Sequence, residues 1–128
     1  AKEGHTSINS GKDICVITPE TNANNQMIFR DNIQKHVFNK QILLLISSAS
    51  TGKTINRSVE CLQYYNGQLA GVASIFSAIN EHNGIQINSI FTSEDLNNYE
   101  TMSAHDCKLC KSGQKVDAII NSFGYSKI

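Results

Sequence analysis

Residues 42–54 read ILLLISSASTGKT, five consecutive aliphatic residues followed by small and hydroxylated ones. A strand that is apolar on both faces is typical of the middle of a parallel sheet. Gly52 and the serines before it predict a loop, and apolar residues then recur at helical spacing. The stretch therefore predicts a buried strand at 42–46, a loop at 47–54 and a helix at 55–65.

Further apolar segments lie on both sides of this stretch. Residues 13–18 (DICVIT) predict a buried strand, and residues 26–38 predict an amphipathic helix with one apolar stripe. Residues 69–76 (LAGVASIF) predict another strand, and residues 84–91 (GIQINSIF) an edge strand. Because strands alternate with helices, this order predicts an α/β fold with a mostly parallel sheet and helices on both faces.

The two ends of the chain are polar. Residues 1–12 predict a mobile N-terminal segment, and residues 95–128 predict a C-terminal extension that is loop-like up to residue 112. Within the extension, residues 116–120 fit either a short helix or a strand. A chain of 128 residues, 40% hydrophobic and 17% charged, is one globular domain or part of one.

Composition excludes several partners and predicts a compartment. Eleven basic and eleven acidic residues balance, so no global field attracts nucleic acid or an anionic membrane. The longest apolar run has five residues, far short of the ~20 that a membrane span needs. Four cysteines are too few for a disulfide scaffold and favour a reduced, cytoplasmic setting. Two of them, Cys15 and Cys61, lie in apolar patterns and are expected in the core.

The loop after the central strand favours phosphate binding. In an open parallel sheet, ligands bind beyond the carboxyl ends of the strands. The hydroxyls of Ser50, Thr51 and Thr54 and the unpaired N–H groups of the following helix suit a phosphate. The same residues also fit a turn that only caps the helix. A third interpretation is a P-loop, which ends in Gly-Lys-Thr as residues 52–54 do, although Ser47 replaces its opening glycine.

Three segments together resemble type I phosphoribosyltransferases. Residues 50–52 (STG) stand where that family carries Thr-Thr-Gly after an aliphatic strand, and Thr54 closes the loop. Residues 64–76 (YYNGQLAGVASIF) are similar to the helix end, glycine turn and strand that follow it. Residues 105–119 (HDCKLCKSGQKVDAI) resemble the Asp-Cys-x-x-Cys-x-x-Gly segment of many orotate phosphoribosyltransferases. The resemblance covers about residues 13–113.

The resemblance implies a phosphoribosyltransferase-like fold. Because only one predicted strand precedes the loop, either an N-terminal part is missing or the domain is a reduced version of that fold. It implies transfer of ribose 5-phosphate from phosphoribosyl diphosphate to a base such as orotate, with Mg²⁺, in a homodimer. Lys2 and His5 would correspond to the family's mobile catalytic loop. The substrate-binding residues would be Ser47, Ser48, Ala49, Ser50, Thr51, Gly52, Lys53 and Thr54.

One position departs from the family. An acidic pair that holds the ribose hydroxyls should precede the loop, but Ile46-Ser47, or one residue later Ser47-Ser48, stands there. A serine cannot supply the negative charge that holds magnesium or steadies a cationic ribosyl group. The alternative function is therefore a non-catalytic sensor of phosphoribosyl diphosphate or of a nucleotide.

A second cluster of reactive residues lies in the extension. His105, Cys107 and Cys110 fall within six residues and can supply three zinc ligands. The same Cys-x-x-Cys spacing also fits a redox pair, or a plain loop turn with free thiols.

Overall fold

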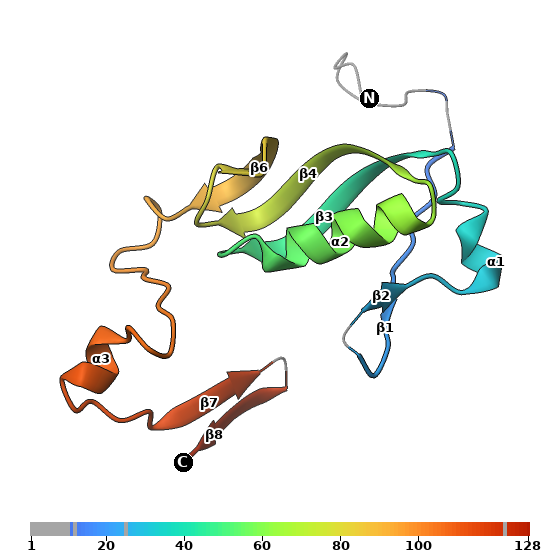
Figure 1. Cartoon of the computed structure of the whole chain (residues 1–128). Helices are drawn as coiled ribbons and strands as arrows, with labels where there is room; N and C mark the ends of the chain where they lie inside the picture. Colours follow the sequence, from blue (N-terminus) through green and yellow to red (C-terminus); the bar gives the residue numbers. More distant parts are fainter. Residues whose placement is uncertain (1–10, 12, 25, 122) are drawn as a thin grey trace. The chain divides into compact units, whose positions relative to one another are not determined.

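The computed structural model describes residues 11, 13–24, 26–121 and 123–128. The chain divides into two units, Ala1–Asn97 and Asn98–Ile128. The first holds eight helices and strands, which include a two-stranded and a four-stranded sheet, and the second holds a helical turn and a hairpin (Figure 1). In chain order the elements are β1 (Glu20–Thr21), β2 (Met27–Ile28), α1 (Asp31–Gln34), β3 (Gln41–Ala49), α2 (Lys53–Tyr64), β4 (Gln68–Ser77), β5 (Glu81–His82), β6 (Ile85–Thr92), α3 (Lys108–Lys111), β7 (Ala118–Asn121) and β8 (Gly124–Lys127).

The main sheet has the strand order β3-β4-β6-β5. β3 runs parallel to β4 and β4 parallel to β6, whereas the short β5 pairs antiparallel with β6. In the register, Leu44 lies beside Val72, and Val72 lies beside Ile87. The carboxyl ends of three parallel strands therefore meet at one edge of the sheet, the edge from which α2 starts.

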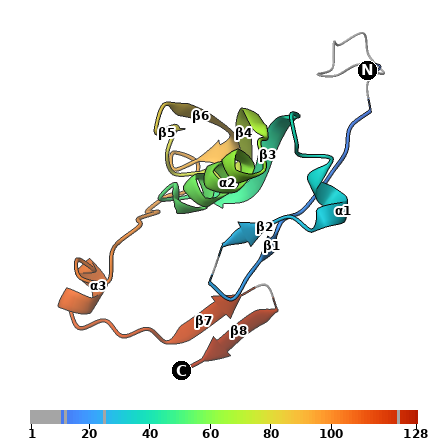
Figure 2. The same cartoon turned by 45° about the vertical axis from the view of Figure 1, so that its right-hand side comes forward.

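Helix α2 lies across one face of this sheet (Figure 2). Its buried residues Ile55 and Leu62 lie on the side that packs against the strands, as the helical spacing of apolar residues predicted. Ile55 joins Ala49, Val72 and Ile87 in one buried cluster. The predicted central strand, the following helix and the strand at 69–76 are confirmed within two or three residues of their expected ends.

A second buried cluster ties the N-terminal part of the first unit to the end of α2. It consists of Phe29, Val37, Cys61 and Leu62. The hydroxyl of Tyr65 accepts a hydrogen bond from the backbone N–H of Phe29 at 3.3 Å, and the two rings meet edge to face. Cys61 is 6% exposed, so the prediction that it belongs to the core is confirmed.

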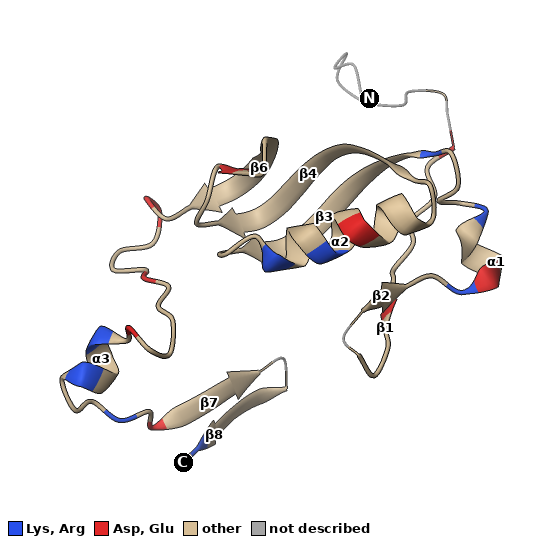
Figure 3. Ribbon diagram, viewed as in Figure 1, with Lys and Arg blue, Asp and Glu red and all other residues tan. Residues whose placement is uncertain are grey.

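The opposite face of the sheet carries exposed apolar side chains. Leu43 and Leu45 are 52% and 67% exposed, and Ile75 and Ile90 on the neighbouring strands are also exposed. The expectation that 42–46 is buried on both faces is therefore wrong. The three long strands also carry no charged residue, so Lys, Arg, Asp and Glu lie on helices, loops and short strands (Figure 3).

The expected phosphoribosyltransferase-like α/β fold, with helices on both faces, is also wrong. The described residues form three helices, of which two have only four residues, and α2 covers one face of the sheet. Three of the strand pairings are antiparallel and involve at least one short strand, namely β1 with β2, β5 with β6, and β7 with β8. A helix-rich fold needs several long apolar stripes, and among the helices of the described residues only α2 supplies one.

Two expectations for the N-terminal third are corrected. Residues 13–18 form no strand, and Ile14, Cys15 and Val16 are exposed, because no neighbouring strand pairs with the segment. In place of the helix expected at 26–38, the structure has only the short helix α1 (Asp31–Gln34), and residues 27–28 pair with β1 instead. Helical periodicity alone could not reveal this competition for the backbone.

The second unit contains α3 and the β7–β8 hairpin. Lys108 pairs with Glu100 at 3.1 Å and Lys111 with Asp106 at 3.3 Å, which ties α3 to the segment before it. Residues 118–121 form a strand, which decides between the two structures expected at 116–120. No helix in the described ranges has the length and apolar character to cross a membrane.

Candidate functional site

The turn between β3 and α2 leaves backbone donors without partners. Gly52 is the N-cap of α2, has φ 75°, and provides no side-chain cap. Within the described part of the chain, the N–H groups of Thr51, Gly52 and Lys53 donate no hydrogen bond, whereas the Gly52 carbonyl accepts from Asn56 at 3.0 Å. The first turn of a helix also carries a partial positive charge. The turn therefore presents unpaired donors and a favourable field to an anion.

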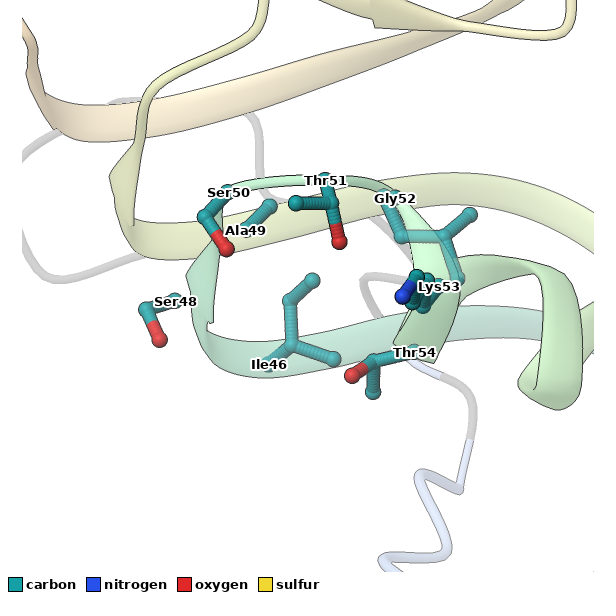
Figure 4. A pocket seen from close by; sticks show the side chains of 9 residues that line it. Ile46, Ser48, Ala49, Ser50, Thr51, Gly52, Lys53 and Thr54 are labelled. Carbon is teal, nitrogen blue, oxygen red and sulfur yellow. The ribbon is translucent and has the colours of Figure 1, made fainter. Parts of the chain in front are cut away.

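The residues that carry these donors line a cavity of about 120 Å³. A single water needs roughly 10–15 Å³ of such space, so a phosphate group fits. Figure 4 shows the hydroxyls of Ser50, Thr51 and Thr54 turned into the space enclosed by the loop, with Ile46 at its floor. The lining residues are Ile46, Ser48, Ala49, Ser50, Thr51, Gly52, Lys53, Thr54 and Ile55.

His82, from β5, packs against this loop. A Cβ added to Gly52 would lie 2.2 Å from Nδ1 of His82, so the ring occupies the space beside the glycine. Nε2 of the same ring lies 2.9 Å from Oδ1 of Asn56, in the first turn of α2. Since an amide oxygen only accepts, Nε2 is the donor in this contact. The imidazole thus connects β5 to both the loop and the helix.

Two aromatic residues lie near the loop, at the carboxyl ends of the neighbouring strands β4 and β6. In the register, Ser48 lies beside Phe76, and Phe76 lies beside Phe91. Side chains alternate between faces along a strand. Phe76 and Phe91 therefore share the face of Val72 and Ile87, the face on which α2 and the cavity lie. Phe91 is 50% exposed, so its ring is accessible beside the site.

Most of the residues expected to bind substrate are brought together. Seven of them, Ser48 to Thr54, line the cavity, while Ser47 does not. Lys2 and His5 lie outside the described residues. Sequence reasoning missed His82 and Asn56, which belong to no motif and meet only because β5 folds back beside α2.

The Cys-x-x-Cys segment forms its own small site in the second unit. Cys107 is the N-cap of α3, and its Sγ accepts a hydrogen bond from the N–H of Cys110 at 3.4 Å. This hydrogen bond, together with that from the Cys110 thiol, lowers the pKa of Cys107. The pKa of Cys110 is raised, because its thiol donates to Cys107 and faces the charge that forms there. No three His, Cys, Asp or Glu side chains in the described ranges are placed to hold a metal ion.

Comparisons with known proteins add no family. No protein-family model matches this sequence, and a search of curated proteins finds no match.

Proposed function

We propose that the cavity between β3 and α2 binds the phosphate of a phosphoribosyl compound, with phosphoribosyl diphosphate as the preferred ligand. The observation that carries this proposal is the set of unpaired N–H groups at Thr51, Gly52 and Lys53, three residues that line a cavity rimmed by hydroxyls. Charge-assisted hydrogen bonds from such donors are about twice as strong as neutral ones. The side chain of Lys53 adds a positive charge at the same rim.

The sugar and the base have a place in this arrangement. The exposed ring of Phe91 lies two strands away from Ser48, roughly 10 Å across the sheet. A ribose that bridges these positions leaves a base such as orotate to stack on the ring, which contributes about 1–3 kcal/mol in comparable sites. This layout supports binding of both the phosphoribosyl donor and its acceptor base.

The cavity supports binding more strongly than transfer. No carboxylate is among the residues that line it. Mg²⁺ would therefore be held mainly through the diphosphate oxygens of the ligand, as this ion commonly is. Transfer of ribose 5-phosphate to orotate stays within the proposal, and a non-catalytic sensor of phosphoribosyl diphosphate is the second candidate, favoured by the missing carboxylates.

Calorimetry on the whole chain tests the proposal. The protein is titrated with phosphoribosyl diphosphate, ATP and orotate, each with and without Mg²⁺, and pyrophosphate release is then assayed. Binding of phosphoribosyl diphosphate with release supports the transferase, and binding without release supports the sensor. Binding of ATP alone would replace both with a P-loop-type nucleotide site, and no binding of any phosphorylated ligand would refute the loop as a phosphate site.

Two matched pairs of variants localise the binding. Thr51→Val removes a hydroxyl at the cavity, whereas Thr101→Val makes the same change at an exposed position in the other unit. Ser48→Ala changes a lining residue, whereas Ser47→Ala changes its neighbour outside the lining. We expect Thr51→Val and Ser48→Ala to weaken binding by roughly threefold to tenfold and the two controls to leave it unchanged.

The homodimer implied by the resemblance belongs to the same proposal. Parallel sheets are ordinarily covered on both faces. The exposed face with Leu43, Leu45, Ile75 and Ile90 is apolar, and its strands are uncharged, so two copies can meet there without charge repulsion. Sedimentation of the wild type against Leu45→Lys tests this. A concentration-dependent dimer that the substitution dissociates supports the interface, and a monomer at every concentration contradicts it.

A further inference from the structure

We propose that Cys107 and Cys110 form a reversible redox dithiol, which cycles between two thiols and an intramolecular disulfide by exchange with a low-molecular-weight disulfide. This site lies in the second unit and is independent of the cavity between β3 and α2. If the phosphate-binding proposal fails, the dithiol is unaffected, because none of its residues lines that cavity.

The backbone places the two sulfurs within reach of each other. Cys107 caps α3 and Cys110 lies three residues on, one helical turn away. Side chains at this spacing have Cβ atoms about 5–6 Å apart, and a disulfide needs roughly 3.5–4.5 Å. The hydrogen bond from the Cys110 N–H to Cys107 Sγ already turns the first sulfur toward the second residue. A small adjustment of one turn therefore closes the bond.

The two thiols also differ in the way that exchange requires. The attacking sulfur should be the more readily ionised one, and it should be accessible. Cys110 is exposed and Cys107 is partly exposed. The N–H of Cys110 donates to Cys107 Sγ, and this donation favours the thiolate there. Cys107 is therefore the attacking residue, and Cys110 is the residue that completes the disulfide.

The charged side chains near Cys107 and Cys110 are paired with one another. The hydrogen bond to Cys107 Sγ therefore determines which of the two thiols ionises more readily. Lys108 and Lys111 flank the thiols on α3, but their amines pair with Glu100 and Asp106. These ion pairs and the hydrogen bond from the Lys108 N–H to Met102 Sδ hold the start of α3 in place. No metal cluster among the described residues competes for the two sulfurs.

The reaction has two exchange steps, with a disulfide such as oxidised glutathione as the oxidant. The Cys107 thiolate attacks one sulfur of glutathione disulfide, the S–S bond breaks, and one glutathione leaves as a thiolate. The Cys110 thiol then loses its proton to that thiolate or to water and attacks Cys107 Sγ, which expels the second glutathione. Two protein thiols are oxidised to one disulfide, and one glutathione disulfide is reduced to two thiols.

Peptide mapping of the full chain in glutathione buffers tests the proposal. After acid quenching and alkylation, we expect the Cys107–Cys110 disulfide to accumulate while the exposed Cys15 carries only thiol or mixed disulfide. Cys110→Ser should trap glutathione on Cys107, and glutathionylation of Cys110 in Cys107→Ser should be several-fold slower than that of Cys107 in Cys110→Ser. In concentrated urea the preference for Cys107 over Cys110 should vanish, because it depends on the folded turn.

Three results would overturn the proposal. One is equal rates of glutathionylation at Cys15 and Cys107 in the folded protein, with no internal disulfide. The second is a preference for Cys107 that survives in urea, since it would then owe nothing to the structure. The third is stoichiometric binding of zinc that protects both thiols from modification and is lost in His105→Ala. This result would make the segment a metal site.

Discussion

Nδ1 of His82 occupies the position into which a side chain at Gly52 would have to project, at 2.2 Å from a Cβ built there. Glycine is required at this position for two reasons. The His82 ring leaves no space for a side chain, and the φ of 75° lies in the left-handed region that L-residues rarely adopt. A residue thirty positions along the chain therefore packs against the turn between β3 and α2 and restricts its shape.

Gly52→Ala should lower the free energy of unfolding by about 2–3 kcal/mol, part from the positive φ and part from the collision with His82. Gly84→Ala is the matched control, because Gly84 has φ 77° but open space around its Cβ position. It should cost only about 1 kcal/mol. Urea denaturation measures both. If the ring causes the difference, adding His82→Ala to Gly52→Ala recovers it, and equal costs at the two glycines would contradict the contact.

His82→Ala should weaken the binding of phosphoribosyl diphosphate by roughly threefold to tenfold, because the loop loses the ring that packs against it. Asn56→Ala should have a smaller effect in the same direction, since it frees the ring at Nε2. His36→Ala serves as the control, because His36 is exposed and lies outside the cavity lining. Calorimetry gives the affinities, and equal losses in the His82 and His36 variants would remove His82 from the site.

The two faces of β3 should respond differently to truncation. Leu44 packs against the buried cluster below α2, whereas Leu45 is 67% exposed on the other face. Leu44→Ala should therefore cost about 2–3 kcal/mol of stability, and Leu45→Ala less than about 1 kcal/mol. Urea denaturation at a protein concentration that keeps the chain monomeric distinguishes them. Similar costs at both positions would show that the outer face is covered in solution.

Burial raises the pKa of the Cys61 thiol. A group whose pKa is higher in the folded state stabilises the fold fully below its unfolded pKa and loses that contribution as pH rises through the folded value. The free energy of unfolding should therefore fall as pH rises above about 8.5, where an unfolded cysteine ionises. The part of this slope due to Cys61 is the difference from Cys61→Ala, and Cys15→Ala, at an exposed site, should keep the wild-type slope.

The sequence predicted elements whose signal is local and strong. The aliphatic run, the loop with Gly52 and the apolar stripe of α2 all appear where expected, because period and composition act within a few residues. The prediction of a strand at residues 13–18 was wrong. These residues have the composition of a strand, but they have no partner strand, and pairing depends on the tertiary structure.

The candidate site divides in the same way. Ser48 to Thr54 were found from the pattern because one continuous loop supplies them. The pattern did not reveal Asn56 and His82, because their contact depends on how β5 folds back beside α2. It also did not reveal that Ser48, Phe76 and Phe91 lie side by side, because this depends on the strand register. The sequence also could not predict that one face of the sheet is exposed, because an aliphatic run has the same pattern whether one face or both faces are covered.

The start of α2 has no side-chain cap, although serine and threonine surround it. Helix caps usually contribute about 1 kcal/mol to stability. Here an anion in the turn would supply the missing hydrogen bonds, so occupancy and folding become thermodynamically linked. A ligand at one hundred times its dissociation constant adds about 2.7 kcal/mol, which appears as a higher melting temperature. If the proposed site is correct, a screen of phosphorylated metabolites by melting temperature will identify its ligand without any assumption about the reaction.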